Sequence, residues 1–464
     1  MCTVCMLTQT FDTIRHAPGE PVFADLYEAE DAAESTATTY SMSIGDTFNG
    51  ELSSVLDEDW VSIELTAGTT YSISHVGVSL SDPLVRLYDS TGQQIAVNDD
   101  GGAGLNSLLT YTAGTTGTYY ISADAYEWND SRSIGTYALS VTESAPPQPA
   151  TEGTLDELAE YLTEGYWGGR EITFDTSASN QITVNLTGLT AAGQQLARWA
   201  MEAWEMAVNL DFVEVSSGEM ITMDDEESGA FAYSPNSGSS NGVELNVSRA
   251  WLTNNGTSID SYSFQTYIHE IGHAVGLGHQ GDYNGNATYG VDETFANDSW
   301  QVSVMSYFSQ TENTSTNASY AYVSTLMMAD ILAAQNLYGA PGASTATAGN
   351  TTYGQGSNLG NYTDEIFNWI ATGNTTANVT GNLMAYTIYD RDGIDTLNFE
   401  FTTNDARLDM RAEQFSDFGT LVGILGIARG TVIENAILGS GHDAVTGNVA
   451  ANMVAGGAGN DLLD

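Results

Sequence analysis

The stretch that decides the fold of this chain reads His269-Glu-Ile-Gly-His-Ala-Val-Gly-Leu-Gly-His279. Residues four apart lie on one face of a helix, so His269 and His273 can bind the same metal ion. Glu270 can reach a water at that ion without being a ligand. Gly276 tolerates the left-handed conformation that ends a helix, and the resulting turn brings His279 back as a third ligand. Three protein ligands with a fourth position open are typical of a catalytic zinc site.

This motif resembles that of the metzincin family, and the residues after it resemble the serralysins. Gln280-Gly-Asp-Tyr-Asn284 is similar to the H-P-G-D-Y-N of that family, with Gln280 in place of Pro, and Ser303-Val-Met-Ser-Tyr-Phe308 is similar to its Met-turn. The resemblance implies that Met305 forms a hydrophobic floor beneath the zinc. It also implies that Tyr307 is a further zinc ligand, which moves aside for the substrate and stabilises the oxyanion.

The predicted activity is that of a zinc-dependent endopeptidase, which hydrolyses peptide bonds of proteins. Zinc would lower the pKa of its water and polarise the carbonyl, and Glu270 would take the water's proton as general base. The stretch Gly229-Ala-Phe-Ala-Tyr-Ser234 resembles the strand on which the family pairs its substrate. The resemblance implies that Ala230, Phe231 and Ala232 contact the protein or peptide substrate along an edge strand.

Two other functions stay open. A non-catalytic, Ca²⁺-dependent matrix or surface binding protein would be expected to have lost Glu270 or a zinc histidine, and all of them are present. A protease dedicated to processing itself or one partner would keep the intact site. Cleavage of an unrelated protein such as casein would distinguish a general protease from a dedicated one.

The composition restricts the partners of the chain. Among 464 residues, 60 are acidic and 10 are basic, all of them Arg, which gives a formal net charge of -50. Such a charge repels phosphate backbones and excludes nucleic acid as a partner. It suits a protein that lives in salt or binds Ca²⁺ through carboxylates. No apolar stretch approaches the roughly 20 residues of a membrane span.

The predicted architecture is multidomain: a β-sandwich, then an α+β metzincin protease domain, then a parallel β-roll. Short alternating strands punctuated by Gly, Asn and Asp predict the sandwich. A Pro-rich run follows it, then helical periodicity, and finally a Gly-rich repeat. The expected segments are a tail that is a candidate inhibitory propeptide at 1–23, the sandwich at 24–143, a linker at 144–150, the protease domain at 151–341 and the β-roll at 342–464.

The Gly-rich repeat lies near the end of the sequence. Gly439-Ser-Gly-His-Asp443 recurs as Gly457-Ala-Gly-Asn-Asp461 after 18 residues, which is two nonapeptides and indicates a β-roll that binds Ca²⁺ in its turns. The serralysin resemblance implies several structural Ca²⁺ ions and a zinc-dependent protease secreted through the type I apparatus. The chain has no Sec-type signal and is predicted to be truncated at its end. The candidate Ca²⁺ ligands are Asp390, Asp392, Asp395, Gly441, Asp443, Gly459 and Asp461.

The N-terminal part poses two open questions. Asp57-Glu-Asp-Trp60 and Gly117-Thr-Tyr-Tyr120 resemble the bacterial pre-peptidase C-terminal domain, which here precedes the protease. This sandwich could bind substrate or matrix, assist folding or be removed on maturation. Cys2 and Cys5 are the only cysteines and could act as a cysteine switch that keeps the enzyme latent, as a zymogen. The alternative is a tail end without a function.

Overall fold

The computed structural model describes residues 24–99, 101–102, 104–128, 131–143, 150–235 and 242–464. Its chain divides into two compact units, Met1–Gln148 and Pro149–Asp464. The expected tail with Cys2 and Cys5 and nearly all of the expected linker lie outside the described residues. Within the described part, none of the helices is both long enough and apolar enough to cross a membrane.

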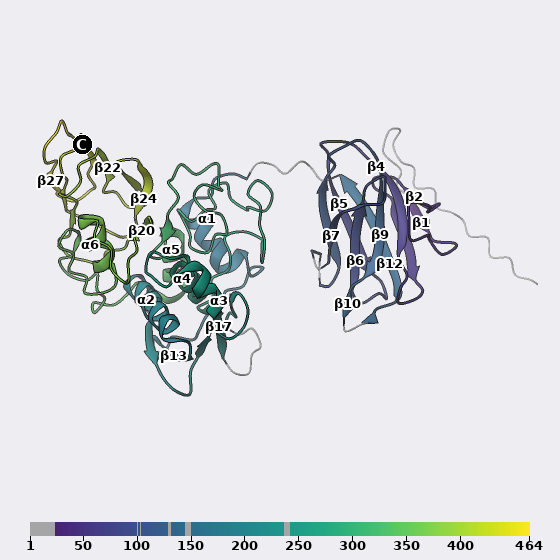
Figure 1. Cartoon of the computed structure of the whole chain (residues 1–464), viewed down its shortest axis with the longest axis horizontal. Coiled ribbons are helices and arrows are strands. Elements are labelled where there is room, and N and C mark those ends of the chain that lie inside the picture. The colour runs from purple at the N-terminus through teal and green to yellow at the C-terminus, as the bar shows by residue number, and fades with distance from the viewer. Residues whose placement is uncertain (1–23, 100, 103, 129–130, 144–149, 236–241) are drawn as a thin grey trace, which may run out of the picture. The chain divides into compact units, whose positions relative to one another are not determined.

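The first unit is a sandwich of two five-stranded sheets (Figure 1). Phe48, Ile73 and Leu139 from one sheet and Leu87 and Ile121 from the other are fully buried in one shared core. This burial follows from the alternation of apolar and polar residues along each strand. The sheets have the orders β1-β3-β12-β5-β8 and β2-β4-β9-β6-β7.

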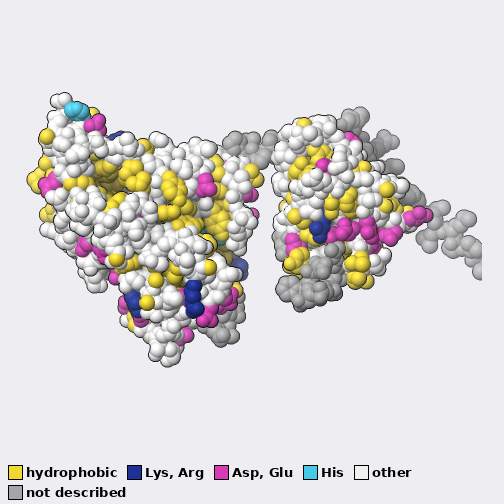
Figure 2. Space-filling view, in the orientation of Figure 1, with side chains coloured by type: hydrophobic (Ala, Val, Ile, Leu, Met, Phe, Trp, Pro, Cys, Tyr) yellow, Lys and Arg dark blue, Asp and Glu magenta, His cyan; other side chains and the backbone are white. Residues whose placement is uncertain are grey.

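The sandwich strands are short, as the sequence predicts. Their bounds are β1 Asp25–Tyr27, β2 Ser41–Met42, β3 Thr47–Leu52, β4 Asp59–Leu65, β5 Thr70–Gly77, β6 Pro83–Tyr88, β7 Gln94–Asn98, β8 Ser107–Thr112, β9 Gly117–Ala125 and β12 Gly135–Glu143, with a hairpin of β10 Glu127–Trp128 and β11 Ser131–Arg132. On the face seen in Figure 2, acidic side chains gather in a band across this unit, in keeping with the charge of the chain.

The N-terminal part of the second unit contains a five-stranded sheet of order β14-β13-β15-β17-β16. Its strand pairs are parallel except that β16, at the edge, is antiparallel to β17. An antiparallel edge strand leaves one row of backbone groups available for a further strand. The bounds are β13 Gln181–Gly188, β14 Asp211–Glu214, β15 Ile221–Asp224, β16 Ala230–Ala232 and β17 Val243–Val247.

Two helices form the core beside this sheet. The Trp204 indole on α2 is fully buried and donates from Nε1 to the Ile268 carbonyl of α4 at 3.1 Å, which fixes the two helices against each other. The Ser261 hydroxyl caps the start of α4 by accepting from the Phe264 amide. The helices of this part are α1 Leu155–Glu160, continued by a π-helical turn at Tyr161–Gly165, α2 Ala191–Ala207, α3 Arg249–Asn255, α4 Tyr262–Ala274 and α5 Met328–Tyr338.

The C-terminal part of the same unit pairs its short strands mostly in parallel. One sheet has the order β19-β21-β25-β27 and the other the order β18-β20-β24-β23-β22-β26-β28, in which only β23 is antiparallel to its neighbours. The helix α6, Thr363–Thr372, is not foreseen by the Gly-rich pattern. The strands are β18 Tyr322–Val323, β19 Thr352–Gly354, β20 Met384–Ile388, β21 Thr396–Asn398, β22 Ala406–Asp409, β23 Phe415–Phe418, β24 Leu421–Ile427, β25 Asn435–Ile437, β26 Ala444–Thr446, β27 Met453–Ala455 and β28 Leu462–Leu463.

Candidate metal centre and substrate cleft

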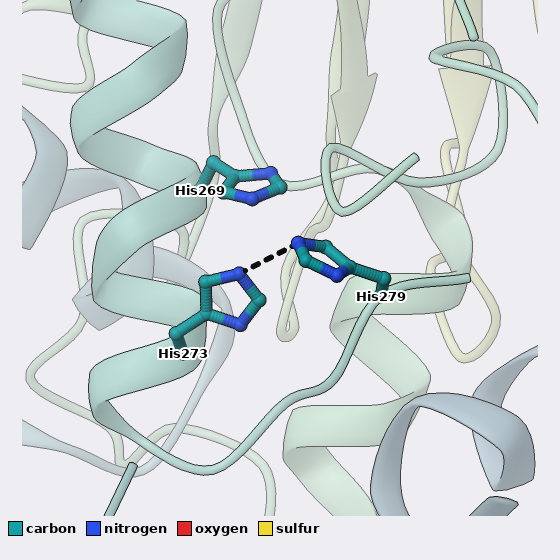
Figure 3. A group of neighbouring side chains, drawn as sticks. All are labelled: His269, His273 and His279. Carbon is teal, nitrogen blue, oxygen red and sulfur yellow. Dashed lines mark hydrogen bonds between the residues drawn. The ribbon is translucent and has the colours of Figure 1, made fainter. Parts of the chain in front are cut away.

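The three histidines of the motif meet at one point (Figure 3). His269 and His273 project from α4, and His279 approaches from the chain that follows the helix. The chain turns at Gly276, whose φ is 107°, and a side chain there would collide with the Ile172 carbonyl. Each histidine offers one nitrogen, and these ligand atoms lie within 4.8 Å of one another. The helix-ending role predicted for Gly276 is therefore confirmed.

The second nitrogen of each ring lies against a backbone carbonyl. A carbonyl oxygen can only accept, so every Nδ1 carries the hydrogen and every Nε2 presents a lone pair. This arrangement fixes the tautomer and the orientation of all three rings. The Nδ1···O pairs, each 2.8 Å long, are His269 with Val304, His273 with Leu277, and His279 with Tyr283.

The converging lone pairs fit a cation other than a proton. Nε2 of His273 and Nε2 of His279 are only 3.0 Å apart (Figure 3), so two unprotonated nitrogens face each other. Burial lowers the pKa of His269 to about 4. Burial, with a smaller contribution from His269, lowers the pKa of His273 to about 3. The pKa of His279 is lowered further, again mainly by burial. Three neutral imidazoles at such distances are suitable ligands for Zn²⁺.

Glu270 is a buried carboxyl group beside this point. Its side chain is 5% exposed, and Oε2 has no hydrogen-bond partner among the described residues. Burial alone raises the pKa of Glu270 to about 8. A carboxylate in such an environment has a strong tendency to take up a proton, which is the property that a general base needs.

Met305 lies directly against the helix that carries the ligands. It is fully buried, and a Cβ on Gly272 would come within 2.5 Å of its sulfur, so the close packing depends on that glycine. The turn around it is held by Asp330, which accepts hydrogen bonds from the Ser303 hydroxyl at 2.7 Å and the Val304 amide at 2.8 Å. The sequence did not indicate this contact of Asp330, because nothing local links Asp330 to the turn.

Tyr307 stands at the rim of the site and is half-buried. Its ring centroid lies 4.5 Å from that of His279 and 6.2 Å from that of His269. Its hydroxyl accepts a hydrogen bond from the Gly285 amide at 3.3 Å. The side chain is therefore close to the histidines and held by one long hydrogen bond, which a small movement would break.

A cleft of about 440 Å³ connects the histidines with the edge strand β16. Ala230, Phe231 and Ala232 are half-buried along it, and β16 pairs with β17 alone among the described strands. The structure thus brings the expected substrate strand to the metal centre. Further lining residues, which sequence analysis missed, are Tyr166, Trp167, Glu227 and Asn284.

The first Ca²⁺ candidates are only partly brought together. Asp390 and Asp395 are both buried, and one oxygen of each has no hydrogen-bond partner among the described groups. Burial, with the charge of Asp395, raises the pKa of Asp390. Asp392 is exposed instead, where it pairs with Arg391 and accepts from the Gly349 amide at 3.0 Å.

The repeat places its candidates in stacked turns. A Cβ on Gly459 would lie 1.9 Å from the Gly441 carbonyl, so the two turns approach as closely as glycine allows. The Asp443 amide donates to Asp461 at 3.1 Å, while Asp443 itself accepts from the Ala406 amide at 2.8 Å. In the repeat, the glycines therefore allow the turns to stack closely, and the carboxylates accept hydrogen bonds from backbone amides of neighbouring turns.

A second group of acidic side chains lies in the sandwich. Glu28, Asp31 and Asp59 bring carboxylate oxygens within 4.8 Å of one another. Asp59 is fully buried and accepts from the Tyr137 hydroxyl at 2.7 Å. The sequence does not reveal this group, since its members lie on separate segments.

Comparison with known families agrees with this architecture. The bacterial pre-peptidase C-terminal domain matches residues 57–125, the matrixin family matches 167–294, and the peptidase M10 serralysin C-terminal family matches 343–463. The metalloprotease AprA of Pseudomonas entomophila is 33% identical over 374 residues, which cover 77% of this chain and 68% of the relative. This chain belongs to the serralysin family. The multidomain prediction, with a sandwich before a protease domain and a serralysin C-terminal domain, is confirmed.

Other serralysin-type relatives match over a similar range. Serralysin C of Dickeya chrysanthemi is 32% identical over 354 residues, covering 72% of this chain and 70% of the relative. The metallopeptidase AprA of Pseudomonas marginalis is 38% identical over 303 residues, covering 61% of this chain and 60% of the relative. A serralysin of Photorhabdus luminescens is 37% identical, with 56% and 53% covered. The matched part of this chain thus spans 60% of the length of the Pseudomonas marginalis relative and 53% of that of the Photorhabdus luminescens relative.

Proposed function

We propose that this serralysin-family chain is a zinc-dependent endopeptidase that hydrolyses peptide bonds of proteins. The convergence of three Nε2 atoms beside a buried carboxyl group, one oxygen of which has no hydrogen-bond partner among the described residues, carries this proposal. His269, His273 and His279 would hold the ion, with Tyr307 as an additional ligand. When bound, Zn²⁺ supplies Lewis-acid chemistry, which polarises a peptide carbonyl and makes water acidic enough to attack near neutral pH.

Glu270 moves the proton. Its carboxylate takes a proton from the attacking water as the oxygen bonds to the carbonyl carbon, and passes that proton to the amine nitrogen when the C–N bond breaks. Because Glu270 is 5% exposed, bulk water does not compete for its charge. Burial makes this carboxyl group a stronger proton acceptor, and the charge of a bound Zn²⁺ would keep it ionised until the water gives up its proton.

Tyr307 and the edge strand act on the substrate. The hydroxyl of Tyr307, once it leaves the Gly285 amide, donates a hydrogen bond to the oxygen on which negative charge develops. The free edge of β16 binds the substrate backbone antiparallel to Ala230, Phe231 and Ala232. The cleft of about 440 Å³ beside β16 offers room for substrate side chains.

We also propose that residues 342–464 form a β-roll with structural Ca²⁺. The parallel pairs β21/β25 and β25/β27, together with the stacked turns at Gly441 and Gly459, support it. Asp390, Asp395, Asp443 and Asp461 are the preferred carboxylate ligands, whereas Asp392 is engaged with Arg391. Because the serralysin resemblance implies export by the type I apparatus, we also propose that this protein is secreted by that route.

The test is casein cleavage by the full chain and by a form that lacks residues 1–20, each with Zn²⁺ and Ca²⁺, beside Glu270→Ala. Cleavage by both forms but not by Glu270→Ala supports the endopeptidase. Activity that appears only on truncation supports the cysteine switch of Cys2 or Cys5 as well. If neither form cleaves although zinc binds stoichiometrically, general proteolysis is wrong and a dedicated or purely binding role takes its place.

A further inference from the structure

Tyr283 lies between a metal-centre histidine and Tyr307. Its carbonyl accepts from Nδ1 of His279 at 2.8 Å, and its hydroxyl oxygen accepts from the Tyr307 backbone amide at 3.2 Å. Its ring centroid lies 4.8 Å from that of Tyr307 and 5.5 Å from that of His279. Tyr283 is 5% exposed, so bulk water does not compete for these hydrogen bonds. The Tyr283 ring therefore contacts both His279 and Tyr307.

The other end of Tyr283 is held by a buried carboxyl group. The Tyr283 hydroxyl lies 3.0 Å from one oxygen of Asp298 and 3.3 Å from the other, and Asp298 is fully buried. The Tyr307 amide can only donate, so the phenol oxygen accepts from it, and the single phenol hydrogen is left for the nearer oxygen of Asp298. The lone pairs of the phenol then face the Tyr307 amide. The direction of both hydrogen bonds is thus fixed.

We propose that Asp298 and Tyr283 are a positioning pair that fixes the backbone of Tyr307, so that the Tyr307 hydroxyl reaches the oxyanion. The proposal rests on the function proposed above. Tyr307 is anchored at its amide by this chain of bonds, whereas among the described residues its own hydroxyl is held only by the 3.3 Å bond from Gly285. Because its backbone is fixed, the Tyr307 side chain can leave the Gly285 amide and still reach a defined position at the oxyanion. Misplacement of such a group lowers the rate without weakening substrate binding.

The variant Tyr283→Phe removes the hydroxyl and keeps the carbonyl that orients His279. We expect zinc affinity within about 3-fold of the parent chain, because the partner of His279 is retained. We expect kcat for casein-derived peptides to fall about 10-fold with KM within about 2-fold. Asp298→Ala should behave in the same way, and Asp298→Asn should lose less, because an amide oxygen still accepts from the phenol.

A cycle with Tyr307→Phe separates positioning from packing. If the pair acts through the Tyr307 hydroxyl, Tyr283→Phe lowers kcat by less than about 2-fold in the Tyr307→Phe background. A merely structural role would cost as much there as in the parent chain. Tyr289→Phe is the matched control, because Tyr289 donates its hydroxyl to the Ala296 carbonyl at 2.8 Å in the same loop region and does not contact the Tyr307 amide.

Amide hydrogen exchange at Tyr307 provides a readout that needs no activity. We expect exchange to become about 10-fold faster in Tyr283→Phe, with or without zinc, and to stay unchanged in Tyr289→Phe. If the unsubstituted chain does not cleave casein but the Tyr307 amide still exchanges faster in Tyr283→Phe, the proposed function is wrong and the anchoring of the Tyr307 backbone is supported. Unchanged exchange, a loss of zinc affinity in proportion to kcat, or an equal kcat loss in the Tyr307→Phe background would each overturn the positioning pair.

Discussion

The helix side and the loop side of the metal centre are built in different ways. His269, Glu270 and His273 lie on α4, so the helical repeat places them relative to one another. His279 and Tyr307 lie outside helices and strands, and carbonyls, a phenol and a buried carboxyl group place them. The helix side should therefore depend on local structure, whereas the loop side should respond to changes at residues remote in sequence.

The largest effect is expected from the helix side. His273→Ala removes one of three Nε2 ligands but leaves α4 able to form, because Ala favours helix. Zinc affinity should fall more than about 100-fold, beyond the loss of a supporting hydrogen bond, and proteolysis should be lost. Competition with a chelator measures the affinity. His442→Ala, in an exposed turn of the C-terminal part, is the control that should bind zinc as before.

On the loop side, Tyr307→Phe should lower kcat about 100-fold, the size expected for one lost oxyanion donor. The KM should stay within about 3-fold, since the phenol acts on the transition state, and three histidines still hold the zinc. Steady-state kinetics at equal zinc content check this. A large rise in KM at constant kcat would instead show that Tyr307 contributes to substrate binding and not to stabilising the transition state.

A substitution at Asp260 tests whether the protein can lose folding stability near α4 while kcat stays unchanged. It is fully buried just before α4 and accepts from the backbone amides of Thr380, Gly381 and Asn382. Burial alone would raise the pKa of Asp260, but hydrogen bonds from the Ser258 hydroxyl and from these backbone amides outweigh it and lower the pKa. Its stabilisation is therefore present above the ordinary pKa of 3.8 and is lost as the pH falls.

We expect Asp260→Asn to lower the free energy of unfolding by about 2 kcal/mol at pH 7, as for a buried charge-assisted hydrogen bond. The kcat per folded molecule should not change. Urea unfolding measures the first quantity and active-site titration the second. The exposed Glu171→Gln should stay within about 0.5 kcal/mol. A change in kcat equal to that of Tyr307→Phe would remove the distinction between stability and chemistry.

Asp298, on the loop side, should show the opposite pH dependence. Burial raises its pKa from 3.8 to about 7, although hydrogen bonds from Ser306 and Tyr283 partly offset this. Folding therefore favours its protonated form, and its stabilisation is full below 3.8 and is lost as the pH rises through about 7. Between pH 5 and pH 8 the free energy of unfolding should fall by on the order of 2 kcal/mol more in the unsubstituted chain than in Asp298→Asn. Urea unfolding at several pH values checks this, and parallel profiles would contradict it.

The sequence predicted what local periodicity and close spacing determine. The helix that carries His269 and His273 and the turn at Gly276 both follow from a short motif. The sandwich followed from alternation along its strands. In each of these cases the residues that matter are close in sequence or repeat a simple pattern.

The remaining contacts depend on how distant segments approach each other. Asp330 accepts hydrogen bonds from the turn at Met305, and Asp298 accepts one from Tyr283, although no motif in the sequence indicates either contact. The helix α6 interrupts a segment whose Gly-rich composition indicated strands. Asp392 pairs with Arg391 and accepts a hydrogen bond from the Gly349 amide, 43 residues away in the sequence, which spacing alone does not predict.

The most direct test of the central claim compares the parent chain with Glu270→Gln at equal, measured zinc content on casein. Because Glu270 is not a ligand in this account, the substitution should leave one zinc per chain and lower kcat about 1000-fold, within the range for a lost general base. Full zinc occupancy with that loss is the predicted result. Equal cleavage by both proteins, or loss of zinc on substitution, would contradict the role assigned to Glu270.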